Sequence, residues 1–153
     1  MKITEMLRRE FILDELAGPG KKEALAELAG AFKKPGINLD HEEMLRVLLE
    51  REKLGSTGIG EGIAIPHGKM AGLQDVVVAF GRSRKGVDFE TLDGRPAHLF
   101  FLLMAPENSS GLHLKVLAKL SKMLKDQSFR KNLLEAESRD DLFKIISEKD
   151  DLV

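Results

Sequence analysis

Histidines are the side chains of this sequence best suited to nucleophilic chemistry, because its 153 residues include no cysteine, tyrosine or tryptophan. A neutral imidazole is nucleophilic, and a reference pKa of about 6.5 keeps it mostly neutral at pH 7. Four are present: His41, His67, His98 and His113. His67 is held rigidly on one side by Pro66 and left open on the other by Gly68. This setting predicts a nucleophile that meets another macromolecule; a loop histidine without a role is the alternative.

Two further residues are placed where they could assist such a nucleophile. His113 is expected in the first turn of a helix, where the helix dipole favours an anion and a neutral imidazole. Arg51 extends the apolar stripe of its helix, and an inward guanidinium needs an anion, either a phosphoryl group or Glu50, Glu52 or Glu61. The alternatives are a core histidine bonded to a carbonyl and an arginine whose head reaches solvent.

A glycine-dense segment separates the helix of Arg51 from His67. Its glycines are Gly55, Gly58, Gly60, Gly62 and Gly68. Such density indicates unusual dihedral angles or a close approach of the backbone to something else. The segment fits neither the dinucleotide fingerprint nor the P-loop, because the spacing of its glycines matches neither pattern. A plain turn-rich connection is the alternative.

Composition limits the class of protein. The net charge is −1, which argues against a dedicated nucleic-acid binder. The longest apolar run, Leu99 to Ala105, is far shorter than the roughly 20 residues of a membrane-spanning helix. No signal-peptide core is recognisable, and the absence of cysteine removes disulfides and zinc-thiolate sites. We therefore expect a cytoplasmic protein of one domain over residues 1–153, with no metal site.

Hydrophobic periodicity predicts helices and buried strands in one α/β sandwich, with helices on both faces of the sheet. Strands are expected at 11–16, 63–65, 76–80 and 99–104, and helices at 21–34, 40–54, 109–125, 128–136 and 139–147. Pro35 and Gly36 are expected to end the first of these helices. The region from Gly81 to Gly94 is expected to be irregular or a hairpin, with a possible extra strand at 87–89. Within it, the basic cluster Arg82 to Lys85 is expected to be a solvated turn.

Residues 51–69 read REKLGSTGIGEGIAIPHGK. This segment closely resembles the active-site signature of the fructose/mannitol-type enzyme IIA of the bacterial phosphoenolpyruvate-dependent phosphotransferase system. That family includes the nitrogen-regulatory enzyme IIA proteins. The similarity extends over nearly the whole chain, with Leu99 to Pro106 similar to the central strand and Leu112 to Leu114 similar to the second histidine motif. The resemblance implies one enzyme IIA type-2 domain, an α/β sandwich with a mixed sheet.

The resemblance also implies roles for particular residues. His67 matches the histidine that accepts a phosphoryl group from the histidine-containing phosphocarrier protein, and Arg51, Glu61 and His113 match supporting positions. In-line transfer spreads negative charge over the phosphoryl oxygens, so such a site needs positioned hydrogen-bond donors. Backbone N–H groups of a phosphate-binding loop would contribute, and the expected loop comprises Gly55, Ser56, Thr57, Gly58, Gly60, Gly62 and Gly68. By analogy with the family, no cofactor and no metal is expected.

The expected acceptor of the phosphoryl group is an enzyme IIB protein or a regulated target protein. Because this sequence contains neither a IIB domain nor a cysteine, we expect that acceptor to be a separate protein. The stretch from Gly55 to Lys69 is most similar to the nitrogen-regulatory branch, which we favour. A freestanding IIA subunit of a sugar transport system is the alternative. Two other classes remain open: a binding module that signals without phosphate, and a hydrolase that uses His67 and His113 as an acid–base pair.

Overall fold

The structure, a computed structural model, describes every residue except 35, 36 and 38. Two short 3-10 helices, η1 (Ile3–Glu5) and η2 (Arg9–Phe11), precede the first strand. The α-helices are α1 (Lys21–Gly30), α2 (His41–Lys53), α3 (Ser110–Leu124), α4 (Gln127–Glu135) and α5 (Arg139–Leu152). The strands are β1 (Ile12–Leu13), β2 (Gly58–Gly60), β3 (Ile63–Ala64), β4 (His67–Met70), β5 (Val77–Val87) and β6 (Ala97–Pro106).

The six strands form one mixed sheet around β6. The strand order is β1-β5-β6-β3-β2, and β4 pairs with β6 beyond the end of β3. β5 runs antiparallel to β6, whereas β3 and β4 run parallel to it. The apolar run from Leu99 to Ala105 is buried throughout, as expected for a strand covered on both faces. His67 thereby stands opposite Leu103, at the start of β4.

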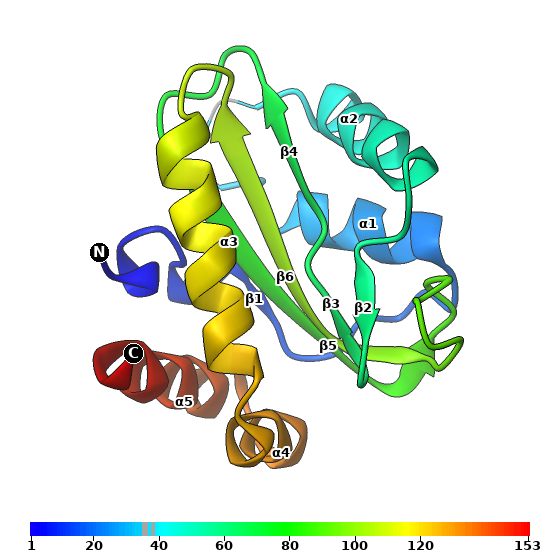
Figure 1. Ribbon diagram of the computed structural model, residues 1–153, viewed down its shortest axis with the longest axis vertical. Helices are drawn as coiled ribbons and strands as arrows, with labels where there is room; N and C mark the ends of the chain where they lie inside the picture. The colour runs from blue at the N-terminus through cyan, green and yellow to red at the C-terminus, as the bar shows by residue number, and fades with distance from the viewer. Residues whose placement is uncertain (35–36, 38) are drawn as a thin grey trace.

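Helices cover both faces of the sheet, and Figure 1 shows α3 crossing in front of the strands and α1 behind them. Close contacts hold α1 and α2 against the sheet: a Cβ added to Gly81 of β5 would lie 2.7 Å from Leu28, and one added to Gly68 of β4 would lie 2.7 Å from Val47. α5 packs against β1 and the N-terminal 3-10 helices. The α/β sandwich with a mixed sheet is therefore confirmed.

Side-chain caps set the starts of α2, α4 and α5. The Asp40 carboxylate accepts a hydrogen bond from the Glu43 amide at the start of α2, and Ser138 caps α5 in the same way. α4 begins at Gln127 behind the Asp126 cap. The first helix ends at Gly30, short of Lys34, and the expected stop at Pro35 and Gly36 lies outside the described residues.

Three sequence-based expectations about strands are wrong. β1 is limited to Ile12 and Leu13, because Phe11 belongs to a 3-10 helix. β2 and β4 lie where the sequence predicted loop, since two- to four-residue strands rich in glycine give no periodic signal. β5 does not stop at Phe80 but runs to Val87, so no separate strand exists at 87–89. Its pairing with β6 continues through Arg82 opposite Leu99 and closes at Val87 opposite Ala97.

The basic cluster expected in a solvated turn is instead part of β5. Arg82 is only 1% exposed, and its guanidinium donates to the carbonyls of Leu133 and Ala136 at the end of α4. Its Nε also donates to the carbonyl of Asp14. A buried guanidinium is accommodated here because backbone carbonyls satisfy its donors. None of the helices that the structure describes is long and apolar enough to cross a membrane.

Candidate active site

His67 is the first residue of β4 and is half-buried. Its Nδ1 lies 2.8 Å from the carbonyl oxygen of Ile65. A carbonyl oxygen can only accept a hydrogen bond, so Nδ1 must carry the proton of the ring. Nε2 then presents an unprotonated lone pair. The carbonyl of Ile65, the residue between β3 and Pro66, thus fixes both the orientation and the tautomer of the imidazole.

His113 lies beside His67, although 46 positions separate them in the sequence. The ring centroids are 5.5 Å apart and the ring planes are inclined by 66°. His113 comes from the first turn of α3 and is 7% exposed. Its Nε2 is buried and has no hydrogen-bond partner among the described residues. Because an unsatisfied buried nitrogen is costly, this atom is suited to binding a group that arrives at the site.

Burial lowers the pKa of both imidazoles from the ordinary value of 6.5. At His67, the Arg51 guanidinium lowers the pKa further, while the Ile65 carbonyl and Glu52 act in the opposite direction without reversing the shift. At His113, the neighbouring His67 and the Lys69 ammonium add to the effect of burial. Both rings are therefore neutral at pH 7, as a nucleophile and a hydrogen-bonding neighbour require.

Arg51 lies in the last turn of α2, near enough to His67 to influence its pKa. Its Nη1 donates to the carbonyl oxygen of Gly55 at 3.0 Å. α2 can approach β4 closely because Gly68 has no side chain: a Cβ there would meet Cγ1 of Val47 at 2.7 Å. Among the described residues, Arg51 forms no ion pair with a carboxylate, so neither Glu50, Glu52 nor Glu61 is its partner.

Glu61 is the one predicted supporting residue that the fold does not bring to His67. It occupies the turn between β2 and β3 with a φ of 57°, and its carboxylate lies 3.5 Å from Arg130. The adjacent Gly62 carbonyl accepts a hydrogen bond from His98, five positions before Leu103 along β6. At about 3.3 Å per residue, this turn lies roughly 16 Å from the pairing position of His67. The expected contact between Glu61 and Arg51 or an imidazole is therefore wrong.

The expected phosphate-binding loop is only partly available for binding an anion. The Ser56 hydroxyl donates to the Phe89 carbonyl, and the Gly58 amide donates to the Ser56 hydroxyl oxygen. Thr57 is buried, and its amide and hydroxyl both donate to the Glu52 carboxylate. Gly60 and Gly62 belong to the distant β2–β3 hairpin, with φ values of 99° and 77° that suit glycine. Of the seven loop residues, Gly55 and Gly68 remain beside Arg51 and His67.

Lys69 is a neighbour of the histidine pair that the sequence analysis missed. It follows His67 by two positions on a strand, which places both side chains on the same face. Its Nζ donates to the Ser110 hydroxyl at 2.6 Å, in the first turn of α3. The strand β4 was not predicted, so the shared face gave no signal. The first turn of α3 contains no acidic residue, and together with Lys69 it presents positive charge.

The two other histidines have structural partners away from this pair. Nδ1 of His41 lies 3.1 Å from the Ala29 carbonyl oxygen, and Nδ1 of His98 lies 2.8 Å from that of Ser83. Among the residues that the structure describes, no group of three or more histidine or carboxylate side chains is arranged to hold a metal ion. The site thus combines a nucleophilic nitrogen with a second imidazole and two cationic side chains.

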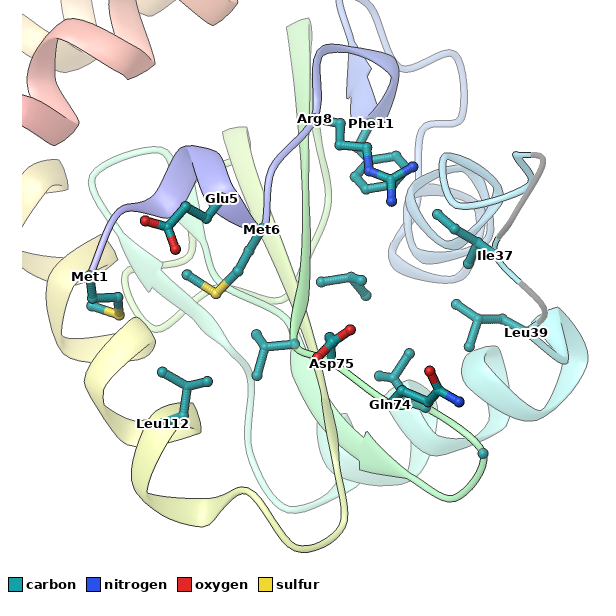
Figure 2. Close-up of a pocket in the computed structure, with 14 residues that line it drawn as sticks. Met1, Glu5, Met6, Arg8, Phe11, Ile37, Leu39, Gln74, Asp75 and Leu112 are labelled. Carbon is teal, nitrogen blue, oxygen red and sulfur yellow. The ribbon is translucent and has the colours of Figure 1, made fainter.

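A spacious pocket lies away from this cluster. A cavity of about 580 Å³ opens beside the N-terminal segment, and none of His67, His113 and Arg51 lines it. Figure 2 shows Met1 and Leu112 on one side of it and Ile37 and Leu39 on the other. This cavity is therefore separate from the candidate site, in which His67 is half-buried on β4 at the edge of the sheet.

Comparison with known proteins gives a family. Residues 5–149 match the family described as "Phosphoenolpyruvate-dependent sugar phosphotransferase system, EIIA 2". The chain is 44% identical over 150 residues to the fructose-specific EIIABC component of the phosphotransferase system of Bacillus subtilis. That alignment covers 98% of this chain and 24% of the relative, so the chain spans about a quarter of that protein's length.

Solved structures share the fold over nearly the whole chain. The nitrogen regulatory protein IIA-Ntr of Neisseria meningitidis is 38% identical with a TM-score of 0.87, covering 94% of this chain and 98% of that one. The complex of enzyme IIA-mannitol and phosphorylated enzyme IIB-mannitol of Escherichia coli contains a chain that is 26% identical, with a TM-score of 0.75. That match covers 91% of this chain and 95% of the other.

Proposed function

The chain belongs to the EIIA 2 family of the phosphoenolpyruvate-dependent sugar phosphotransferase system and acts as a phosphocarrier, and we propose that Nε2 of His67 is the atom that carries the phosphoryl group. The observation on which this proposal rests is the hydrogen bond from Nδ1 of His67 to the Ile65 carbonyl. It leaves Nε2 as the unprotonated, nucleophilic nitrogen of the ring. The lowered pKa of His67 keeps that lone pair available at neutral pH.

The transfer is a displacement at phosphorus between two imidazoles. The lone pair of Nε2 attacks the phosphorus of a phosphohistidine on the donor protein, the new P–N bond forms, and the donor's P–N bond breaks with return of its electron pair. Negative charge on the equatorial oxygens increases the need for positioned donors. Arg51 supplies a guanidinium, and the buried Nε2 of His113 supplies a hydrogen-bonding position beside the phosphorus.

The proposed partners are two proteins. The donor is the histidine-containing phosphocarrier protein, and the acceptor is a separate enzyme IIB protein or a regulated target. The relative in complex with phosphorylated enzyme IIB supports an acceptor of the IIB type. A single domain over residues 1–153 and a cytoplasmic location, where these partners would be met, are parts of the same proposal.

Between regulation and sugar transport, we favour the nitrogen-regulatory role. The support is the IIA-Ntr structure, whose chain is matched over 98% of its length with a TM-score of 0.87. The fructose-specific relative keeps transport as the second candidate, because its identity is 44%. Purified fructose-type IIB distinguishes the two: rapid transfer from the phosphorylated chain to IIB indicates transport, and a stable phosphorylated chain in its presence indicates regulation.

The phosphorylation site is tested by incubating the protein with phosphoenolpyruvate, enzyme I and the phosphocarrier protein. We expect a mass increase of about 80 Da, one phosphoryl group, which acid removes. His67→Ala should show no increase, whereas His41→Ala, in a histidine at the opposite end of α2 from Arg51, should be phosphorylated normally. Phosphorylation of the His67→Ala variant would refute the assignment. Equal binding of partner proteins by both forms of the chain would instead indicate a phosphate-independent binding module.

A further inference from the structure

Glu52 is a buried carboxylate next to Arg51 that the transfer step does not use. Its side chain is 4% exposed, and Oε1 lies 3.0 Å from the ammonium of Lys21, the first residue of α1. The same oxygen accepts a hydrogen bond from the Thr57 amide at 3.1 Å, and Oε2 accepts one from the Thr57 hydroxyl. A carboxylate with three partners in the protein interior fixes those partners strongly in place.

Thr57 connects this carboxylate to His67 through the backbone. The carbonyl oxygen of Thr57 accepts a hydrogen bond from the Ile65 amide at 3.0 Å. The carbonyl oxygen of Ile65 in turn accepts the Nδ1 proton of His67 at 2.8 Å. Ile65 is 4% exposed and is followed by Pro66, so the chain there has little freedom to move alone. Thr57 therefore helps to hold Ile65, whose carbonyl sets the tautomer of His67.

The hydrogen bonds around Glu52 and Thr57 also help to hold Arg51 in place. Glu52 directly follows Arg51 on α2, and the Arg51 guanidinium donates to Gly55, two positions before Thr57. Hydrogen bonds from Arg51 to Gly55 and from Thr57 to Glu52 therefore hold the segment 51–57 in one conformation. The side chain of Lys21 is 13% exposed, and its Nζ lies 5.0 Å from the ring centroid of Phe89 in the segment after β5, which helps to hold the ion pair in place.

We propose that Glu52 is a positioning residue for phosphoryl transfer, acting through Thr57 and Ile65 to hold His67 in the tautomer whose Nε2 is nucleophilic. This inference rests on the proposed function of His67 and adds a residue to it. It also reassigns Thr57, which the sequence predicted as a phosphate ligand: its amide and hydroxyl both face the Glu52 carboxylate. Thr57 is a link between Glu52 and the imidazole and not a donor to the phosphoryl group.

The test uses two variants that weaken the link at different points: Glu52→Gln removes the charge of the acceptor, and Thr57→Val removes the hydroxyl donor while it keeps the amide donor. Thr57→Val leaves the ion pair of Glu52 with Lys21 intact, so it remains informative where Glu52→Gln does not fold. Thr57→Ser keeps the hydroxyl and is the conservative variant. Glu50→Gln is the matched control, because Glu50 lies on the same helix with an exposed side chain paired to Lys53.

Nitrogen-15 NMR of the His67 ring reports the tautomer without any phosphorylation. We expect the wild type, Thr57→Ser and Glu50→Gln to hold the proton on Nδ1, and Glu52→Gln and Thr57→Val to populate both tautomers. The rate of phosphoryl acceptance should fall on the order of tenfold or more in these last two and stay within about twofold in the others. A wild-type tautomer and rate in folded Glu52→Gln would overturn the inference, and the same result in folded Thr57→Val would refute the role of the hydroxyl, including where the melting temperature is lowered.

The two proposals fail in distinguishable ways. A wild-type chain that accepts no phosphoryl group refutes the function of His67, whereas the NMR measurement still decides whether Glu52 and Thr57 control the tautomer. If the tautomer shifts in the variants while the rate stays at the wild-type value, the positioning role is refuted and the function of His67 stands.

Discussion

At the scale of single residues, the site is defined by what each imidazole nitrogen can do. Nδ1 of His67 is committed to a backbone carbonyl, which leaves Nε2 as the nucleophile. Nε2 of His113 is buried with no partner in the part of the chain that the structure describes, 5.5 Å away between ring centroids. Arg51 contributes charge, and its guanidinium donates to the Gly55 carbonyl. In the proposed function, these three side chains together hold the phosphoryl anion.

The lowered pKa of His67 gives a pH prediction. Burial and the Arg51 guanidinium hold the pKa of His67 below the ordinary value of 6.5, so most of the imidazole is neutral at pH 6.5 and phosphoryl acceptance persists to a lower pH than for an ordinary histidine. The rate should fall only as the pH drops through the lower, folded pKa. The imidazole of His67 binds a proton more tightly in the unfolded chain than in the folded one. The free energy of unfolding should therefore decrease as the pH falls below 6.5. Proton NMR titration of the ring, together with a pH–rate profile, measures both quantities.

Arg51→Met provides the control for that titration. Removing the guanidinium eliminates one cause of the lowered pKa, so the His67 midpoint should rise relative to the wild type. A wild-type midpoint at or above 6.5, or no change in the variant, would contradict the electrostatic account of the site.

At the scale of elements, the site depends on two helices that approach β4 from different sides. α3 brings His113 to the face of β4 that carries His67, while α2 brings Arg51 past the position of Gly68. The close approach of α2 is possible because Gly68 has no side chain, and Val47 occupies the space that one would fill. Gly68 is therefore required for packing between a helix and a strand, a different reason from the phosphate binding expected from the sequence.

Gly68→Ala tests this packing. Its Cβ would lie 2.7 Å from Cγ1 of Val47, a stiff β-branched side chain in a helix, so α2 must move away from β4. We expect a loss of about 1–3 kcal/mol in the free energy of unfolding, together with slower phosphoryl acceptance as Arg51 moves. Urea denaturation and the phosphorylation assay measure the two effects.

Two further variants control for the added methyl group itself. Gly30→Ala, where no heavy atom lies within 4 Å of the new Cβ, should change stability by no more than about 1 kcal/mol. The double variant Gly68→Ala/Val47→Ala should recover part of the lost rate because it restores space for the helix. Wild-type stability and rate in Gly68→Ala alone would show that α2 does not depend on this close contact.

At the scale of the whole molecule, one buried carboxylate links both ends of the described chain to the helix of the site. Asp150 of α5 accepts hydrogen bonds from the Ile3 and Thr4 amides and pairs with Lys119 of α3 at 2.6 Å. Lys119 also donates to the carbonyl of Met1. α3 carries His113 in its first turn, so the N-terminal segment and α5 together brace the helix that completes the site.

The lowered pKa of Asp150 predicts that the free energy of unfolding decreases in acid. Burial alone would raise the pKa of Asp150, but the Lys119 ammonium and the amides of Ile3 and Thr4 outweigh it and hold the pKa below the ordinary value of 3.8. The stability that this group contributes is present above pH 3.8 and is lost as the pH falls through the folded pKa. Asp150→Asn should cost about 2–3 kcal/mol at pH 7, and the difference from the wild type should shrink in acid.

Asp151→Asn is the matched control, because the neighbouring carboxylate is 68% exposed and pairs with an exposed lysine. That variant should lose less than about 1 kcal/mol in urea denaturation at pH 7. An Asp150→Asn variant as stable as Asp151→Asn would show that the buried pair does not brace α3.

The layers of the fold and the positions of the candidate site residues could be predicted from the sequence where they have local signals. Apolar periodicity marks the helices and the central strand, and the apolar stripes of two helices pointed to Arg51 and His113. The contacts of Glu61 and Arg82 could not be predicted, because they depend on pairings distant in sequence. Strand register carries Glu61 away from His67, and the end of α4 supplies carbonyls to Arg82. Short strands such as β4 also lack a pattern, so the neighbouring position of Lys69 was missed.

The central claim concerns a single atom, and the most direct measurement identifies the nitrogen that carries phosphorus. After phosphorylation by the upstream donor, phosphorus-31 and nitrogen-15 NMR of the intact protein distinguish the two ring nitrogens of each histidine. The structure predicts one phosphoramidate, on Nε2 of His67, with Nδ1 still bonded to the Ile65 carbonyl. A phosphoryl group on Nδ1 of His67, or on either nitrogen of His113, would contradict the account.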